Sequence, residues 1–152
     1  MFKQALDALA TLSVPGVMTH HALESIPDQV HRGQMPLLLV LPIEPEGDSG
    51  GLFAERGGGF ESLAFANGGG TVTYQLTHLL LVAPDSAGGG VRSHLPALID
   101  LIDAYFTALG ADVTLGGRLA QAAQVRVDPG IHSYGGVDYI GCAFRHTWVL
   151  RL

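Results

Sequence analysis

The fold is decided by the closing stretch of the chain, Tyr134-Gly-Gly-Val-Asp-Tyr-Ile-Gly-Cys-Ala-Phe-Arg-His-Thr-Trp-Val-Leu-Arg-Leu152. Its side chains alternate in character with a period of two, which is typical of a β-strand with one buried and one wet face. The expected buried face consists of Ile140, Cys142, Phe144, His146, Trp148 and Leu150, and the wet face of Arg145, Thr147 and Arg151. We therefore expect a sheet to organise the molecule.

The composition points to a surface that is partly covered by other protein. The chain has 152 residues, enough for one domain that buries roughly 70% of its unfolded surface. Apolar residues make up 47% and charged residues only 14%, against roughly 25% charged in ordinary soluble domains. So few charges on so apolar a chain favour a homo-oligomer.

Charge and cysteine usage exclude several classes of function. The net charge is −6, with eight Lys and Arg residues and no basic cluster, so we do not expect the chain to wrap nucleic acid. The single cysteine, Cys142, excludes an internal disulfide and a cysteine-built zinc site. The apolar runs 35–43 and 76–83 are too short to span a bilayer, and the first residues lack the layout of a signal peptide.

Two helices are predicted. Apolar residues recur at helical spacing from Phe2 to Leu12. A longer helix is expected over residues 93–109, with Ser93 as its N-cap and Gly110 as a left-handed stop. The predicted apolar stripe of this helix comprises Leu95, Leu98, Ile99, Ile102, Tyr105, Phe106 and Leu109.

Three further strands are predicted between the two helices in the sequence. Five aliphatic residues, 37–41, lie between prolines and indicate a buried strand. Residues 60–67 and 71–82, separated by three glycines, are typical of a hairpin.

The remaining segments complete the predicted architecture. Residues 119–127 are expected to form a weaker strand, and Asp128-Pro-Gly130 a turn. A flexible glycine-rich loop is expected at about 44–59. The sequence therefore predicts a single domain over residues 1–152 of the α+β class, with an antiparallel or mixed sheet and two main helices packed on one face.

Seven histidines raise the question of a metal site. His20, His21 and His31 show no spacing that brings ligands together on one element. His78 and His146 each fall on the apolar face of a predicted strand, so their rings could meet in the core. We favour neutral core histidines with hydrogen-bond partners. The alternative is a small metal-dependent hydrolase that uses this pair.

Other candidate motifs offer little chemistry. The tract Gly88-Gly-Gly90 has neither the ending of a P-loop nor a complete GxGxxG pattern. Ser49 has no strand-turn-helix elbow around it. Asp100 and Asp103 share the wet side of the predicted helix, as ordinary solvated charges do. We therefore expect no cofactor and no catalytic activity.

Four segments carry a resemblance to a known family. They are Met35-Pro-Leu-Leu-Leu-Val-Leu-Pro42, Tyr74-Gln-Leu-Thr-His-Leu-Leu-Leu-Val82, the helix over 93–109, and the ending Tyr134 to Phe144. In layout the chain resembles the tail terminator proteins of long, non-contractile-tailed bacteriophages and related prophages. The resemblance implies a subunit of a six-membered ring in the tail–neck region of the virion, assembled in the host cytoplasm. Such a ring caps the tail tube, ends tube polymerisation and offers the joining surface to the head.

The same resemblance implies the partners: further copies of the chain, the major tail tube protein and the head-completion or connector protein. Genome DNA would pass through the lumen without sequence-specific binding, and no membrane is involved. The interface residues expected to engage the tube are Phe53, Arg56 and Phe60, and those expected to pair with acids on a neighbour are Arg118, Arg126, Arg145 and Arg151. The alternatives are a head-completion or connector (neck) protein, and a binding module whose glycine-rich loop closes over a small ligand.

Overall fold

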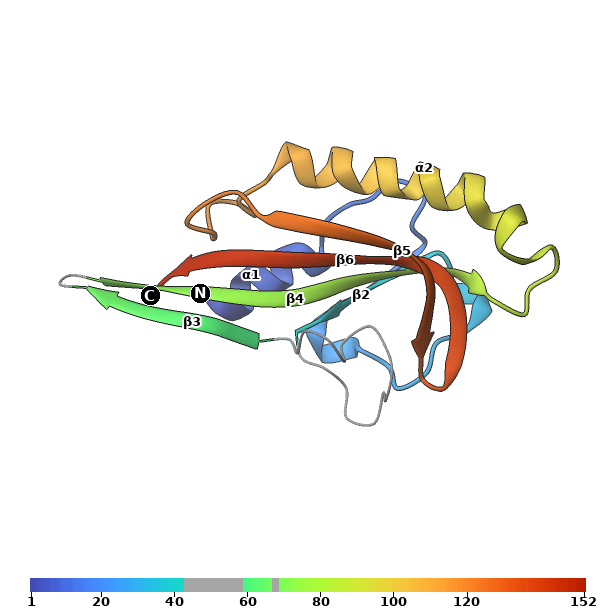
Figure 1. Cartoon of the computed structure of the whole chain (residues 1–152), viewed down its shortest axis with the longest axis horizontal. Coiled ribbons are helices and arrows are strands. Elements are labelled where there is room, and N and C mark those ends of the chain that lie inside the picture. The colour runs from blue at the N-terminus through green and yellow to red at the C-terminus, as the bar shows by residue number, and fades with distance from the viewer. Residues whose placement is uncertain (43–58, 67–68) are drawn as a thin grey trace.

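A computed structural model describes residues 1–42, 59–66 and 69–152. It contains one mixed sheet and two α-helices, which confirms the predicted α+β class (Figure 1). In chain order the elements are α1 (Phe2–Ala10), β1 (Thr19–His21), β2 (Leu37–Leu41), β3 (Gly59–Ala66), β4 (Gly69–Pro84), α2 (Gly90–Ala111), β5 (Gln124–Tyr134) and β6 (Val137–Arg151). Two short 3-10 helices, Leu23–Ser25 and Arg32–Gln34, lie between β1 and β2.

The sheet is built around two long central strands, β4 and β6. Its strands are ordered β1-β2-β4-β6-β5, and β3 also pairs with β4. Among the described strands, β1 and β2 run parallel and the other pairs are antiparallel. Along one edge, β4 pairs first with β3 as far as Gln75 and then with β2 from Thr77 onward. Figure 1 shows β3 and the start of β4 reaching well beyond the ends of both helices.

Both helices cover the same face of the sheet, as predicted. The core on this face includes Leu6 and Leu9 of α1 together with Leu98 of α2. The sheet contributes the alternate residues of its two central strands, and the members from β6 are Ile140, Cys142, Phe144, Trp148 and Leu150. His146 is also buried. The buried face predicted for the closing strand is therefore confirmed.

A second, smaller core covers the opposite face of the sheet. Leu37, Leu39 and Leu41 of β2 belong to it, whereas Leu38 and Val40 belong to the helix-covered core. All five side chains of β2 are consequently buried, in agreement with the prediction.

The lid over this second core is the segment that joins β1 to β2. The Tyr134 hydroxyl donates a hydrogen bond to the Pro27 carbonyl, and the Tyr139 hydroxyl donates one to the Val30 carbonyl at 3.4 Å. Val30 itself is buried in this core. Two tyrosines of the hairpin β5–β6 therefore hold an irregular segment that has little secondary structure of its own.

The limits predicted for the second helix are wrong at both ends. The helix begins at Gly90, because Gly89 with a φ of 90° lets the chain enter the helix three residues before Ser93. Ser93 therefore lies inside the first turns, where its hydroxyl donates to the Gly90 carbonyl at 3.0 Å. Gly110 is still helical, and α2 ends at Ala111.

Among the described residues, no helix has the length and apolar character needed to span a membrane.

The predicted turn at Asp128-Pro-Gly130 is also wrong. These residues lie within β5, which runs from Gln124 to Tyr134, and not at its end. Pro129 is tolerated there because β5 is the edge strand of the sheet, where a missing N–H breaks no central ladder. The turn lies at Gly135 and Gly136 instead, whose φ values of 57° and 80° suit a two-residue hairpin loop.

Candidate functional site

The two histidines singled out from the sequence do meet in the core, through a tyrosine of α2. His78 Nδ1 lies 2.8 Å from the Tyr105 hydroxyl, which lies 2.7 Å from His146 Nε2. All three side chains are buried. Trp148 Nε1 donates to His146 Nδ1 at 3.2 Å and extends the chain of bonds. We call these residues the His–Tyr–His network.

The tryptophan fixes the direction of every hydrogen bond in this network. Trp148 can only donate, so His146 Nδ1 must be the unprotonated acceptor. The neutral His146 ring then carries its proton on Nε2 and donates it to the Tyr105 oxygen. Tyr105 in turn donates its own proton to His78 Nδ1. Every hydrogen bond of the network is satisfied with all the rings neutral.

Burial keeps the network uncharged. Desolvation lowers the pKa of His146 to about 3 and holds the pKa of His78 well below its usual range, with a smaller contribution from the nearby His146. Desolvation also raises the pKa of Tyr105 well above 10.0. Among the described residues, no group of three or more His, Cys, Asp or Glu side chains is placed to hold a metal ion. The arrangement suits a polar connection inside the core.

Two of the four predicted interface arginines have partners within the chain. Arg126 Nε lies 3.0 Å from one carboxylate oxygen of Asp128, and Arg145 Nε lies 2.5 Å from the other. Burial opposes the ionisation of Asp128, but the bonds and charges of Arg145 and Arg126 outweigh it and lower the pKa. Whether these arginines also contact a neighbour stays a prediction.

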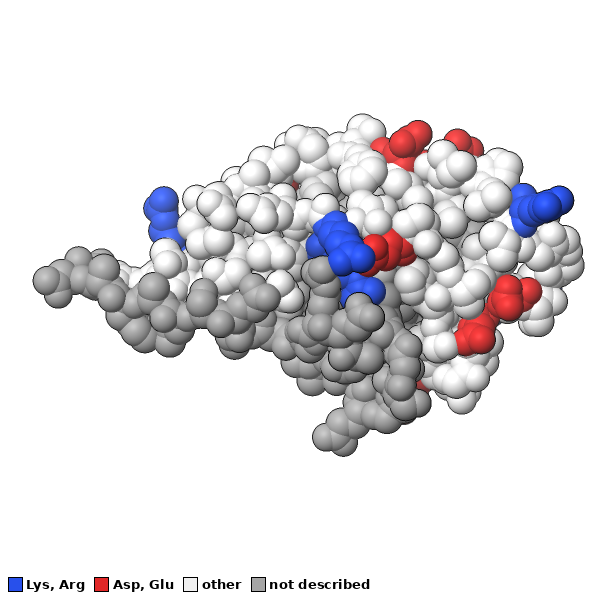
Figure 2. Space-filling view, in the orientation of Figure 1, with Lys and Arg blue, Asp and Glu red and all other residues white. Residues whose placement is uncertain are grey.

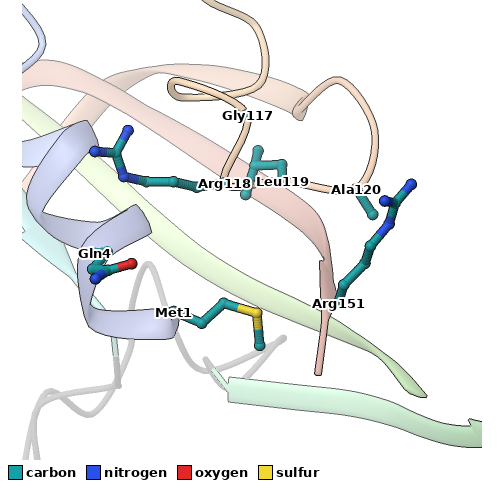
Figure 3. A pocket seen from close by; sticks show the side chains of 7 residues that line it. All are labelled: Met1, Gln4, Gly117, Arg118, Leu119, Ala120 and Arg151. Atoms are coloured by element: carbon teal, nitrogen blue, oxygen red, sulfur yellow. The ribbon is translucent and has the colours of Figure 1, made fainter. Parts of the chain in front are cut away.

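The other two arginines line one pocket (Figure 3). Arg118 comes from the loop after α2, and Arg151 from the end of β6. The remaining wall is formed by Met1, Gln4, Gly117, Leu119 and Ala120, which enclose a volume of about 330 Å³. The structure therefore brings together two predicted interface residues that are 33 positions apart in the sequence, from 118 to 151.

Of the three residues predicted to contact the tube, the structure describes Phe60 and leaves out the other two. Phe53 and Arg56 lie outside the described residues, as does the predicted flexible loop up to residue 58. Gly59 and Phe60 already belong to β3, where Phe60 pairs with Tyr74 of β4.

One side of α2 exposes large apolar side chains that the sequence pattern assigned to the core. The fractional exposure is 40% for Leu95, 55% for Ile99 and 46% for Phe106. Leu98, Tyr105 and Leu109 of the predicted stripe are buried as expected, together with Leu101, which the prediction leaves out. Leu95, Ile99 and Phe106, here called the α2 apolar stripe, follow one another on a single side of the helix because their spacings are four and seven.

The α2 apolar stripe is in contact with the core. Among the described residues, Figure 2 shows basic and acidic side chains side by side near the middle of this view, with a few further charges towards the rim. Phe106 contacts the buried Phe144 edge to face, with 6.3 Å between ring centroids, so the stripe continues directly from the core. Ile131 of the edge strand β5 is 43% exposed and pairs with the buried Ile140. Ile131 therefore lies on the helix-covered face of the sheet, as Ile140 does.

Sequence reasoning missed two residues that organise these sites. Tyr105 was assigned only a packing role, although its place among the apolar positions of α2 left its hydroxyl without an obvious partner. Asp128 was assigned to a turn, because Asp-Pro-Gly is a strong turn signal.

Comparison with protein-family models, with curated proteins and with solved structures found no match to this chain.

Proposed function

We propose that this chain is a structural subunit of a phage virion, which assembles into a ring, caps the tail tube, ends tube polymerisation and joins the tail to the head connector. The observation that carries the proposal is the α2 apolar stripe, whose three large side chains are 40% to 55% exposed. A contiguous apolar surface of this kind marks a protein–protein contact. The family resemblance implies an α+β subunit, and the fold of this chain belongs to that class.

The interior of the protein also supports a structural role. The His–Tyr–His network is buried, and both nitrogens of His146 and the Tyr105 hydroxyl are hydrogen-bonded within the fold. The proposed function depends on contacts between protein surfaces and involves no chemical reaction. The partners are copies of the same chain, the tube protein and the connector, while DNA passes the lumen of the ring. The net charge of −6 disfavours tight binding to phosphates.

The test is deletion of the gene in the phage that carries it, followed by electron microscopy of the particles. Overlong tails without heads would support termination of the tube. Tails of normal length that fail to join heads would indicate a neck protein instead. In parallel, sedimentation of the purified chain alone and with tube protein measures assembly directly. A chain that stays monomeric in both samples contradicts the proposal.

A further inference from the structure

The Arg118–Arg151 pocket offers two cationic groups around an apolar surface. Met1, Leu119 and Ala120 supply aliphatic contact between the two arginines (Figure 3). Within the described residues, no carboxylate lies within ion-pair distance of either guanidinium; Arg118 donates to the carbonyl of Leu115 at 2.7 Å. The pocket therefore fits a surface that presents an apolar side chain together with carboxylates.

Two acids near Arg118 are engaged elsewhere. Asp7 and Asp112 line an adjoining pocket together with Arg118. Asp7 forms an ion pair with Lys3 at 3.0 Å, and Asp112 accepts a hydrogen bond from the Gly116 N–H at 2.8 Å. Both carboxylates thus have partners of their own, and neither forms an ion pair with Arg118.

The surface of α2 has the complementary chemistry. Asp100 and Asp103 are exposed, and their spacing of three places them next to each other on the helix. Neither forms an ion pair within the described residues. Ile99 and Phe106 of the α2 apolar stripe adjoin them on the same helix. One helix face therefore combines two free carboxylates with two exposed apolar side chains.

We infer that the Asp100–Asp103 face of one copy docks onto the Arg118–Arg151 pocket of the next copy. This inference rests on the proposed function and names the surfaces through which the ring forms. The two surfaces lie on different elements of the chain: mid-α2 on one side, and the start of α1 with the end of β6 on the other. A contact between two different patches is heterologous, and it generates a ring when the rotation between subunits closes.

Charge reversal tests the pairing directly. The variants are Arg118→Glu with Arg151→Glu, and Asp100→Lys with Asp103→Lys, each in the full chain. Each variant alone places like charges opposite each other, which opposes association. We expect the dissociation constant of assembly, measured by sedimentation, to rise at least about tenfold for each variant.

An equimolar mixture of the two variants is the decisive sample. In the mixture every reversed pocket can meet a reversed acidic face, so alternating subunits restore both kinds of contact. We expect assembly to return to within about threefold of the wild-type dissociation constant, a difference well under the 1.4 kcal/mol of a tenfold change. The quadruple variant, which carries both reversals, should assemble alone for the same reason. Recovery in the mixture also shows that both variants are folded.

The matched control for the pocket variant is Arg32→Glu with Arg92→Glu. It changes the net charge by the same amount as the pocket variant, at two exposed sites outside both surfaces. It should assemble like the wild type. If the wild type forms rings and the Arg118 and Asp100 variants do so equally well, the docking inference is overturned while the proposed function stands. The docking inference is likewise overturned if the mixture fails to recover, or if the pocket variant loses only tube binding. A monomeric wild type refutes the proposed function itself.

Discussion

Gly141 of β6 lies directly against the backbone of Leu80 in β4: a Cβ on Gly141 would sit 2.0 Å from the Leu80 carbonyl oxygen. The contact falls beside the bulge that shifts the β4–β6 register between Leu81 and Ala83. The two longest strands of the sheet therefore depend on a glycine at this position in order to pack closely.

The variant Gly141→Ala should destabilise the fold by at least about 1–3 kcal/mol, because the methyl group can be accommodated only if backbone shifts. The measurement is the free energy of unfolding in urea. Gly69→Ala is the matched control, since a Cβ there meets nothing within 4 Å, and it should change the free energy by less than about 0.5 kcal/mol. Equal stability of both variants would contradict the close approach.

Tyr105→Phe should lower the free energy of unfolding by about 2–6 kcal/mol. The change removes one oxygen and leaves His78 Nδ1 and His146 Nε2 without partners, at about 1–3 kcal/mol for each buried group. Tyr139→Phe makes the same chemical change where the hydroxyl bond to Val30 is 3.4 Å long, and it should cost less. If Tyr139→Phe costs as much as Tyr105→Phe, the network has no special role in stability.

The stability of the protein should fall as the pH drops below about 6.5. Burial lowers the pKa of His78 and His146, the latter to about 3, so the unfolded chain binds protons that the folded chain excludes. The stabilising contribution of both histidines is complete above pH 6.5 and falls as the pH drops, and that of His146 is lost towards pH 3. The loss is about 1.4 kcal/mol per pH unit for each histidine.

Urea unfolding between pH 7.5 and 5 measures this slope. The pKa of His20 and that of His132 are also lowered, mainly by burial, so both act in the same direction. NMR titration of the folded protein supplies the control, because the His146 ring should show no change of charge down to pH 4.5. A free energy of unfolding that stays constant over this range would contradict the buried neutral network.

Asp128→Asn should destabilise the protein by about 1–2 kcal/mol. The change weakens two ion pairs, and the Arg145 side chain in one of them is only 18% exposed. The value lies below the 3–5 kcal/mol of a fully buried pair because water reaches Asp128. Glu24→Gln removes the exposed pair with Lys3, and it should leave the urea midpoint unchanged. Equal effects of the two variants would show that the Asp128 ion pairs stabilise the fold no more than an exposed pair does.

The regular part of the fold could be predicted from the sequence, because the residues that are apolar in the sequence pattern of each strand are also the ones that the sheet buries. The alternation from Ile140 to Leu150 identified the core face of β6, and the aliphatic run 37–41 identified β2. The ends of α2 could not be predicted, because the left-handed conformation of Gly89 competes with the capping preference of Ser93. The Asp-Pro-Gly motif predicted a turn at Pro129, but this residue lies within β5, because an edge strand tolerates a proline.

The candidate sites were less accessible from the sequence, because each joins segments that are distant along the chain. The alternation along the strands placed the histidine pair on one face of the sheet. The hydroxyl that bridges them belongs to Tyr105 of α2, and strand alternation does not predict how a helix packs on the sheet. The Arg118–Arg151 pocket depends on α1, a loop and the end of a strand meeting at one place. Residues of the α2 apolar stripe have helical spacing like those of the core, so periodicity alone could not separate the two sides.

Trp148 gives the molecule a built-in optical reporter. It is the single tryptophan of the chain, its side chain is fully buried, and its indole N–H is bonded to His146. All indole fluorescence therefore originates from the centre of the core. Unfolding brings that ring into water, so the emission should shift to longer wavelength and follow every stability experiment above without an added label.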